Sequence, residues 1–108
     1  MKQRKAKEAT IPPVQGETIR HAIIILLVDS PASARDLSQA VRIPEKEVYA
    51  HLEHIRRSAP HEGRHLEVTP AQCKRCGYLF QKRDRLTPPG RCPLCRHEAI
   101  AEPLFSLR

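Results

Sequence analysis

Two Cys-x-x-Cys pairs decide the fold of this chain's C-terminal third: Cys73-Lys74-Arg75-Cys76 and, fifteen residues further on, Cys92-Pro93-Leu94-Cys95. These pairs contain all four cysteines of the sequence. Two residues between thiolates let one tight turn aim both sulfurs at a single ion, and two such turns complete a tetrahedral shell. The spacing therefore predicts one structural Zn²⁺, with the ligands Cys73, Cys76, Cys92 and Cys95.

The residues beside the cysteines bear on how the two turns form. Gly77 follows the first pair, where glycine tolerates the positive φ of a chain that folds back on itself. Pro93 stiffens the second turn by fixing its own φ. Arg96 stands where the second turn would suit a glycine, so we expect that turn to be the less ideal of the two.

Three other uses of the cysteines compete with zinc. Iron suits the same cage of four sulfurs. Two disulfides would need an oxidising compartment, which nothing in the sequence indicates. A redox-active Cys-x-x-Cys pair opens a helix in a βαβ unit, and this chain shows no such pattern. Because four thiolates leave no coordination position open, a catalytic zinc is not expected.

The length allows one small domain or two very small ones, since the chain has 108 residues. Residues 73–108 are too few to bury a core alone, so bound metal would supply the missing stability. Residues 22–28 form an apolar run too short to cross a membrane, and residues 1–16 lack the apolar stretch of a signal peptide. We therefore expect a cytoplasmic protein.

The formal charge is +7, and it is unevenly placed. Residues 1–16 carry +3 and residues 73–108 carry +5, whereas residues 17–60 are neutral. A basic chain of this kind favours polyanions such as nucleic acid. The positive charge is thus expected at the N-terminal end and around the cysteines.

Residues 1–16 are predicted to be a basic flexible tail, because Pro12 and Pro13 disfavour a helix there. A first helix is predicted over residues 17–28. Its inward face would consist of Ile19, Ala22, Ile23, Leu26 and Leu27. The other faces are also largely apolar, which indicates cover on more than one side, either by the C-terminal ribbon or by a second copy. We favour the second copy and expect a homodimer.

Two more helices are predicted, over residues 33–41 and 44–58. Ser33 is the expected N-cap of the former, with an acid three residues later at Asp36. Pro44 suits the first position of the latter, where its missing N–H costs nothing. Three short helices with a tight turn between the last two make a helix-turn-helix. The expected buried residues of these two helices are Leu37, Ala40, Val41, Val48, Leu52 and Ile55.

One segment strongly resembles the helix-turn-helix of winged-helix transcription regulators such as the ArsR and MarR families: Asp36-Leu37-Ser38-Gln39-Ala40-Val41-Arg42-Ile43-Pro44-Glu45-Lys46-Glu47-Val48. In those families the helix after the turn lies in the major groove of DNA. The outward face implied by the resemblance is Lys46, Ala50, Glu53, His54 and Arg57. Apart from Arg57, this face lacks the Arg, Asn and Gln side chains that usually read base edges, so we expect it to read them weakly.

The predicted contacts to DNA therefore come from two places. The turn and the outward helix face supply Arg42, Lys46, Ala50, His54 and Arg57. The basic loop of the ribbon supplies Lys82, Arg83 and Arg85, because such loops commonly touch phosphate or an acidic protein.

Short strands are predicted after the helices. Residues 61–69 lie where a wing belongs, and residues 65–68 alternate like a strand. This wing looks short, since Pro70 leads almost at once to Cys73. In the ribbon, strands are predicted over residues 77–80, with Tyr78 and Phe80 on one face, and over residues 98–102 and 104–107.

The predicted fold class is α+β. A three-helix winged helix-turn-helix over residues 17–70 is followed by a small β-structure over residues 71–108, a zinc ribbon held by the four cysteines.

The order of these modules carries a second resemblance. A winged helix followed by Cys-x-x-Cys-Gly-Tyr-x-Phe and Cys-Pro-x-Cys is similar to a family of predicted prokaryotic transcription regulators, helix-turn-helix fused to a zinc ribbon. The order also resembles the large subunit of archaeal transcription factor E, where the module binds polymerase and promoter. These resemblances imply a DNA-binding transcription regulator with a structural zinc and double-stranded DNA as its partner. The alternative is a protein-interaction module that docks on RNA polymerase or another regulator.

Catalysis is not expected, because the sequence offers no nucleophile–base set, no phosphate-cradling loop and no open metal position. Four histidines invite a second metal site: His51, His54, His61 and His65. No acid or cysteine completes such a set, so we expect them to be ordinary solvated or core-edge side chains.

Overall fold

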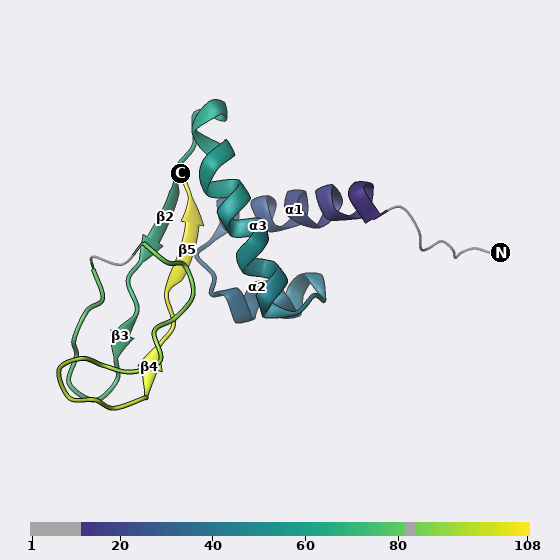
Figure 1. The fold of residues 1–108 in the computed structure, drawn as a ribbon. Helices are drawn as coiled ribbons and strands as arrows, with labels where there is room; N and C mark the ends of the chain where they lie inside the picture. Colours follow the sequence, from purple (N-terminus) through teal and green to yellow (C-terminus); the bar gives the residue numbers. More distant parts are fainter. Residues whose placement is uncertain (1–11, 82–83) are drawn as a thin grey trace.

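The computed structural model describes residues 12–81 and 84–108 (Figure 1). Three helices come first in the chain and two small two-stranded antiparallel sheets follow. The elements are α1 (Pro12–Asp29), α2 (Ala34–Val41), α3 (Glu45–Ser58), the 3-10 turn η1 (Ala59–Glu62), β2 (Leu66–Thr69), β3 (Gln72–Cys73), β4 (Ile100–Ala101) and β5 (Leu104–Leu107). Residues 1–11 of the predicted tail lie outside the described residues.

Helix α1 begins at Pro12, earlier than the predicted start at residue 17. The prediction that the paired prolines exclude a helix was therefore wrong for residues 12–16. Proline is tolerated in a first turn, because the N–H that it lacks would have no partner inside the helix and its fixed φ suits helical geometry.

Helix α2 starts as predicted, at a Ser33 N-cap. The Ser33 hydroxyl accepts from the Asp36 N–H at 3.1 Å, and the Asp36 carboxylate accepts from the Ser33 N–H at 3.1 Å. These two bonds satisfy backbone donors that the helix itself cannot pair. Helix α3 begins one residue later than predicted, because Pro44 is extended and forms its N-cap.

The core lies between the three helices and β5. Its members are Ile23, Leu27, Ala34, Leu37, Val48, Leu52, Ile55, Ala59, Leu86, Phe105 and Leu107. Two predicted core residues are exposed instead: Ala40 and Leu26, the latter 36% exposed. Helix α2 packs through the face that holds Ala34 and Leu37, which leaves Ala40 outside.

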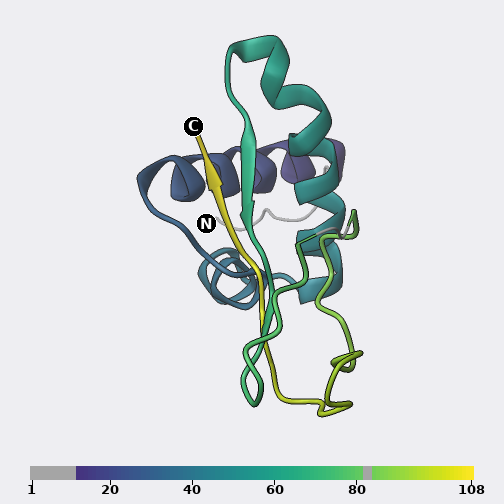
Figure 2. The same cartoon turned by 90° about the vertical axis from the view of Figure 1, so that its left-hand side faces the viewer.

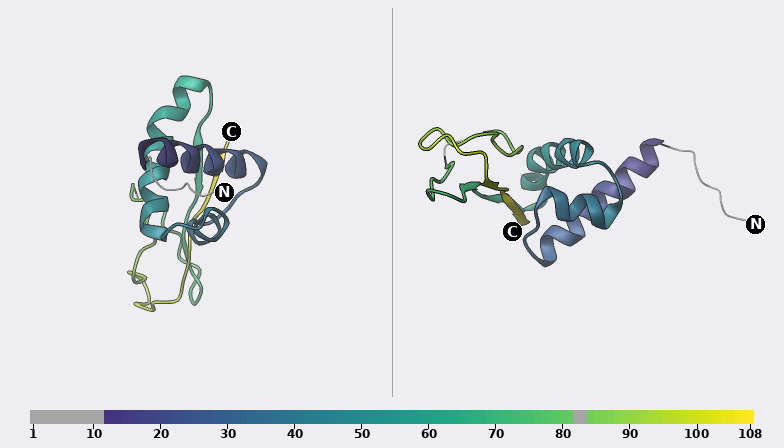
Figure 3. Two further views of the ribbon diagram at one scale, coloured as in Figure 1. Left: turned by 90° about the vertical axis from the view of Figure 1, so that its right-hand side faces the viewer. Right: turned by 90° about the horizontal axis from the view of Figure 1, so that it is seen from below.

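Helix α1 buries only one of its apolar faces. Ile23 and Leu27 are buried, whereas Ile25 is 56% exposed and Val28 is 43% exposed. The ribbon does not cover these residues, since α1 and the ribbon lie on opposite sides of the molecule (Figure 3). No helix in the described parts of the chain is long and apolar enough to span a bilayer.

Strand β5 belongs to the helical half, although it follows the ribbon in sequence. It pairs antiparallel with β2, from Leu66 opposite Leu107 to Thr69 opposite Leu104. Its other edge exchanges two backbone hydrogen bonds with Ala32, at 2.9 and 2.8 Å. The predicted strand over residues 104–107 is therefore present, and it pairs with the short strand β2 of the predicted wing. The ribbon is inserted between β2 and β5, which run side by side against the helices (Figure 2).

The inserted ribbon contains less regular strand than predicted. Residues 77–80 form no strand, only a single bridge between Gln72 and Leu79. The rings of Tyr78 and Phe80 meet edge to face, with centroids 5.0 Å apart. The predicted strand over residues 98–102 shrinks to β4, which pairs with β3. Tight turns around the cysteines use the backbone donors and acceptors that longer strands would need.

The position of β5 predicts that Phe105 stabilises the helices. Phe105 is fully buried, so Phe105→Ala should lower the free energy of unfolding of the zinc-loaded protein by about 3–5 kcal/mol. The matched control is Leu104→Ala on the same strand, where the side chain is 38% exposed and the cost should stay near 0.5 kcal/mol. Denaturant titration followed by helical circular dichroism measures both, and equal losses would contradict the role of β5.

Candidate metal centre and nucleic-acid interface

The four cysteines lie on two turns of the same construction. We call residues 73–78 the first knuckle and residues 92–97 the second knuckle. In each knuckle the N–H of the first cysteine donates to the carbonyl of the sixth residue, at 2.9 Å in both. In each, the N–H of the fifth residue donates back to the carbonyl of the first cysteine, at 3.0 Å from Gly77 and 2.8 Å from Arg96. The two turns are therefore equivalent residue by residue.

The sulfur atoms converge on one point. All four Sγ atoms lie within 4.8 Å of one another, and the pairs Cys73–Cys95 and Cys76–Cys92 are each 3.6 Å apart. Zinc–sulfur bonds of about 2.3 Å in a tetrahedron place the sulfurs about 3.8 Å apart. The distances are far longer than the roughly 2.05 Å of a disulfide bond, and all four cysteines are free. The cluster fits the predicted zinc ion, and it is the only such group of ligands among the described residues.

Backbone donors surround the sulfurs and favour thiolates. The N–H groups of Arg75 and Leu94 each lie 3.4 Å from the sulfur of the cysteine two residues before. The backbone N–H of Cys76 is the largest influence on Cys73 and helps to lower its pKa to about 6. At Cys76 the N–H of Tyr78 lowers the pKa, but burial and the three neighbouring sulfurs outweigh it and raise the pKa to about 12. Four negative charges so close together repel one another, so the cluster requires a cation to be fully ionised.

The predicted DNA-facing side of α3 is exposed. Lys46, Ala50, His54 and Arg57 recur along one exposed stripe of the helix. Glu53 was also predicted to point outward but is half-buried, because its carboxylate holds Arg56 at 2.6 Å. Arg42 is exposed at the end of α2.

The loop over residues 84–87 lies against the flank of α3 (Figure 2). The guanidinium of Arg56 donates to the Asp84 carbonyl at 3.0 Å, and Leu86 inserts into the core with 3% of its surface exposed. Arg85 remains exposed and lines a shallow hollow of ≈ 290 Å³ together with Ala50 of α3. The structure thus brings one predicted loop cation beside the predicted helix face. Lys82 and Arg83 lie outside the described residues.

Sequence reasoning missed the residues that attach this loop. Leu86 was not assigned to the core, and Arg56 was not given a role. A signal was present, since Leu86 is a single apolar residue directly after a basic run, and such a residue commonly anchors a loop.

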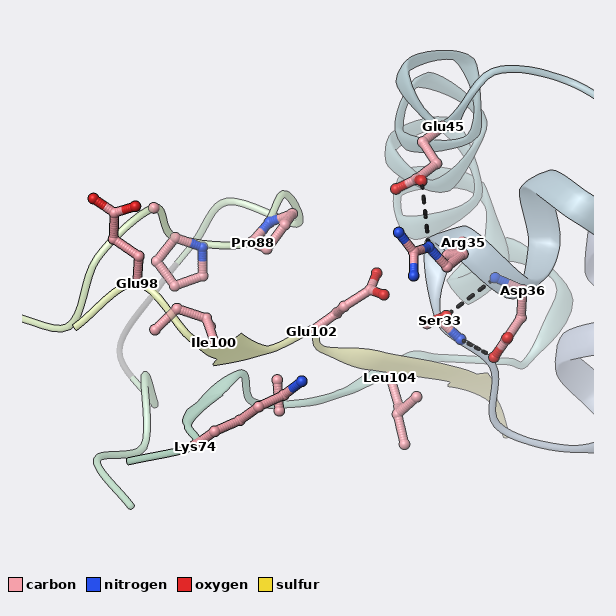
Figure 4. Close-up of a pocket in the computed structure, with 13 residues that line it drawn as sticks. Ser33, Arg35, Asp36, Glu45, Lys74, Pro88, Glu98, Ile100, Glu102 and Leu104 are labelled. Carbon is pink, nitrogen blue, oxygen red and sulfur yellow. Dashed lines mark hydrogen bonds and ion pairs between the residues drawn. The ribbon is translucent and has the colours of Figure 1, made fainter. Parts of the chain in front are cut away.

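A larger hollow, of ≈ 660 Å³, opens between the ribbon and the starts of α2 and α3 (Figure 4). Glu102 points from the end of β4 toward Arg35, which pairs with Glu45 at 3.9 Å. Lys74 and Glu98 also line this hollow. Because its charges are mixed, this hollow has no clear preference for a polyanion.

The four histidines weighed as a second metal site lie outside both knuckles. His51 is half-buried, and burial followed by the nearby Arg20 lowers its pKa. His54, His61 and His65 are exposed. None of them joins a group of three or more metal-binding side chains within the described ranges.

Comparisons with known proteins find an N-terminal domain and a zinc ribbon, and the ribbon match includes β5. Residues 18–66 match the family model described as PF0610-like, N-terminal, and residues 70–108 match the PF0610 rubredoxin-like zinc beta-ribbon domain. The solution NMR structure of protein PF0610 from Pyrococcus furiosus is similar at a TM-score of 0.72 and 31% sequence identity, over 99% of this chain and 98% of that one. No curated protein matches.

Zinc removal is predicted to unfold the helical half as well as the ribbon. Leu86 precedes the second knuckle in sequence and Phe105 follows it, and both belong to the core. A ribbon that has lost its metal would no longer hold these two side chains in place. Chelation should therefore abolish cooperative thermal unfolding of the helices, and adding back one equivalent of Zn²⁺ should restore it. Circular dichroism with metal analysis checks this, and a helical transition that survives in metal-free protein would contradict it.

Proposed function

The chain belongs to the PF0610-like family, and from that premise we propose that it is a winged-helix DNA-binding transcription regulator whose zinc serves the fold. In this proposal the chain is a binding protein and not an enzyme. The four-thiolate site supports that part, since it leaves no coordination position for a substrate or a reactive water.

The observation that carries the proposal is the meeting of two basic segments on one surface. The exposed stripe of α3 contributes Lys46 and Arg57, and the loop docked on its flank contributes Arg85. These residues are far apart in sequence and come together only because Leu86 is buried beside α3. Together they offer cations near both ends of the helix that would enter a major groove and, through Arg85, beside its middle.

The acidic side chains of α3 reduce the affinity of this surface for phosphates less than the sequence alone indicates. Glu53 is held by Arg56 at 2.6 Å, and Glu45 lies 3.9 Å from Arg35. Glu53 and Glu45 therefore each face a cation, whereas Glu47, also exposed on α3, has no ion pair among the described residues. The neutral sum over residues 17–60 hides this arrangement, in which two acids of α3 are paired while Lys46 and Arg57 have no ion-pair partner among the described residues.

In the proposed mechanism, α3 lies in the major groove and the ribbon takes the place of a wing. The hairpin of β2 and β5 continues into the ribbon, which projects beyond the helices (Figure 1). Affinity would come mainly from phosphate contacts, because few side chains on the stripe suit the hydrogen-bond pattern of base edges. Binding should therefore weaken steeply with salt as counterions rebind to the DNA.

Removing the cations of this surface tests the proposal. Lys46→Ala with Arg57→Ala, and separately Arg85→Ala, should weaken binding of the zinc-loaded chain to duplex DNA. Each lost phosphate contact should also reduce the slope of log affinity against log salt by about 1.

The matched control for these variants is Arg108→Ala, which removes a cation already paired with Glu67 at 2.8 Å. Its affinity should stay near that of the wild-type chain. Fluorescence anisotropy across a salt series measures all four proteins, and equal affinities would refute the proposed surface.

We also propose that the chain acts as a homodimer through α1. The exposed side chains Ile25 and Val28 line a hollow of ≈ 480 Å³ whose rim carries both Glu62 and Arg64. A two-fold pair brings the same patch of each copy together, so a patch with both signs of charge can complement itself. The cover that α1 lacks within one chain would then come from a second copy.

The dimer proposal predicts that a charge on α1 separates the copies. Ile25→Glu should convert the dimer to a monomer without lowering the helical signal, because the side chain is already 56% exposed. The control is Glu17→Gln, an exposed change near the other end of the helix. Sedimentation equilibrium reports the mass, and a wild-type monomer at every concentration would contradict the proposal.

One observation favours a second function, that of a docking module for another protein. Leu94 is 70% exposed at the tip of the second knuckle, and Leu79 of the ribbon is 42% exposed. Exposed apolar side chains on a basic ribbon suit a partner with an apolar and acidic surface, such as a subunit of the transcription machinery. Recovery of such a subunit by a chain that shows no duplex affinity would favour this function.

A further inference from the structure

Two arginines occupy a backbone conformation that normally belongs to glycine. Among the described residues other than glycine, only Arg42 and Arg96 have positive φ, at 61° and 64°. In this left-handed region the Cβ atom of an L-residue crowds the following carbonyl oxygen, so a side chain there is strained. Both side chains are exposed, so burial does not account for them.

The first knuckle shows which residue this turn prefers. Gly77 and Arg96 are equivalent, because each donates its N–H to the carbonyl of the first cysteine of its knuckle. Gly77 has φ of 84°, and a Cβ built there would meet only Gln72 Nε2, at an ordinary 3.8 Å. A side chain would therefore have room at this position, and the backbone angle alone explains why glycine is preferred there. The second knuckle makes the same turn with an arginine and bears the strain.

Arg42 repeats the pattern in the helical half. It ends α2 in the left-handed conformation, with its N–H donating to the Ser38 carbonyl, and the Ile43 N–H donates to the same oxygen at 3.2 Å. Helices that end in this way usually carry glycine at the left-handed position. Both turns therefore have the geometry of glycine and the side chain of arginine.

Neither guanidinium makes a contact that stabilises the fold among the described residues. Within the described ranges, no acceptor or ion-pair partner holds the side chain of Arg42 or Arg96. Other arginines do have carboxylate partners: Arg35, Arg56, Arg91 and Arg108. A strained backbone that persists without an internal contact points to an external one.

We propose that Arg42 and Arg96 contact the phosphodiester backbone of the DNA, an inference that rests on the proposed function. A guanidinium can donate two parallel hydrogen bonds to a phosphate, which suits a cation fixed on a short turn. The start of α3 and the ribbon both extend toward the lower end of the molecule in Figures 1 and 2. A duplex along α3 can therefore meet Arg42 in the turn before that helix and Arg96 on the ribbon.

The test replaces each arginine by the residue that its backbone prefers. Arg42→Gly, Arg96→Gly and the double variant should not lower the thermal midpoint of the zinc-loaded full chain, and relief of strain should raise it by a few degrees. Each single change should reduce the log–log salt slope for duplex DNA by about 1, and the double change by about 2. Higher stability with weaker binding is the signature of a residue retained for its ligand.

The matched control is Arg91→Gly, because Arg91 has ordinary φ and is paired with Glu98 at 3.4 Å. It should lower the thermal midpoint and leave the salt slope unchanged. Arg96→Asn adds a second check, since asparagine tolerates the left-handed region without carrying charge and should behave like glycine.

The outcomes separate this inference from the proposed function. If the wild-type chain binds duplex and Lys46→Ala with Arg57→Ala weakens it, but the glycine variants keep the full salt slope, the phosphate contacts are refuted and the regulator stands. If Arg96→Gly lowers the thermal midpoint, the arginine serves the knuckle and the inference fails. If the wild-type chain shows no duplex affinity, both proposals fail together.

Discussion

Four sulfurs closing on one cation are the constraint on which the rest of the structure depends. Thr69 and Leu104 pair across two strands, yet residues 70–103 lie between them. Bringing the ends of such a segment together costs about 3 kcal/mol of chain entropy beyond a constant. Sheet pairing of β3 with β4 involves only two residues on each strand. A structural zinc site contributes on the order of 10 kcal/mol, so the metal dominates this closure.

Closure also shapes the surface of the helical half. The return of the chain to β2 seats Phe105 among the helices, and the loop before the second knuckle seats Leu86 beside α3. Arg85 then lies beside Ala50, although the two residues are far apart in sequence and no local structure brings them together. The cations of this surface are thus positioned by a metal that lies elsewhere in the molecule. The net charge of the chain favours polyanions, while the placement of its cations decides where they would bind.

Ion pairs distinguish the charged side chains that stabilise the fold from those that are free to bind a ligand. Glu53 and Glu45 are matched by arginines, and so is Glu67 at the end of β2. Arg42 and Arg96 stand outside these pairs on strained turns. A small protein has a low free energy of unfolding. This arrangement therefore distinguishes residues that stabilise the fold from residues that destabilise it.

The sequence by itself determined the metal site, the presence of the three helices and the Ser33 cap of α2, because each rests on short-range spacing. Two Cys-x-x-Cys turns, Ser33 before Asp36, and apolar residues three and four apart all act within a few residues. Only the tertiary structure decided that β5 pairs with β2, that Leu86 enters the core and that α1 leaves one apolar face uncovered. Those outcomes depend on where the chain packs after it leaves the ribbon. The alternating pattern of residues 104–107 suits a strand within the ribbon and a strand against the helices equally well. The helix start at Pro12 was missed for a local reason, since proline forbids the interior of a helix but suits its first turn.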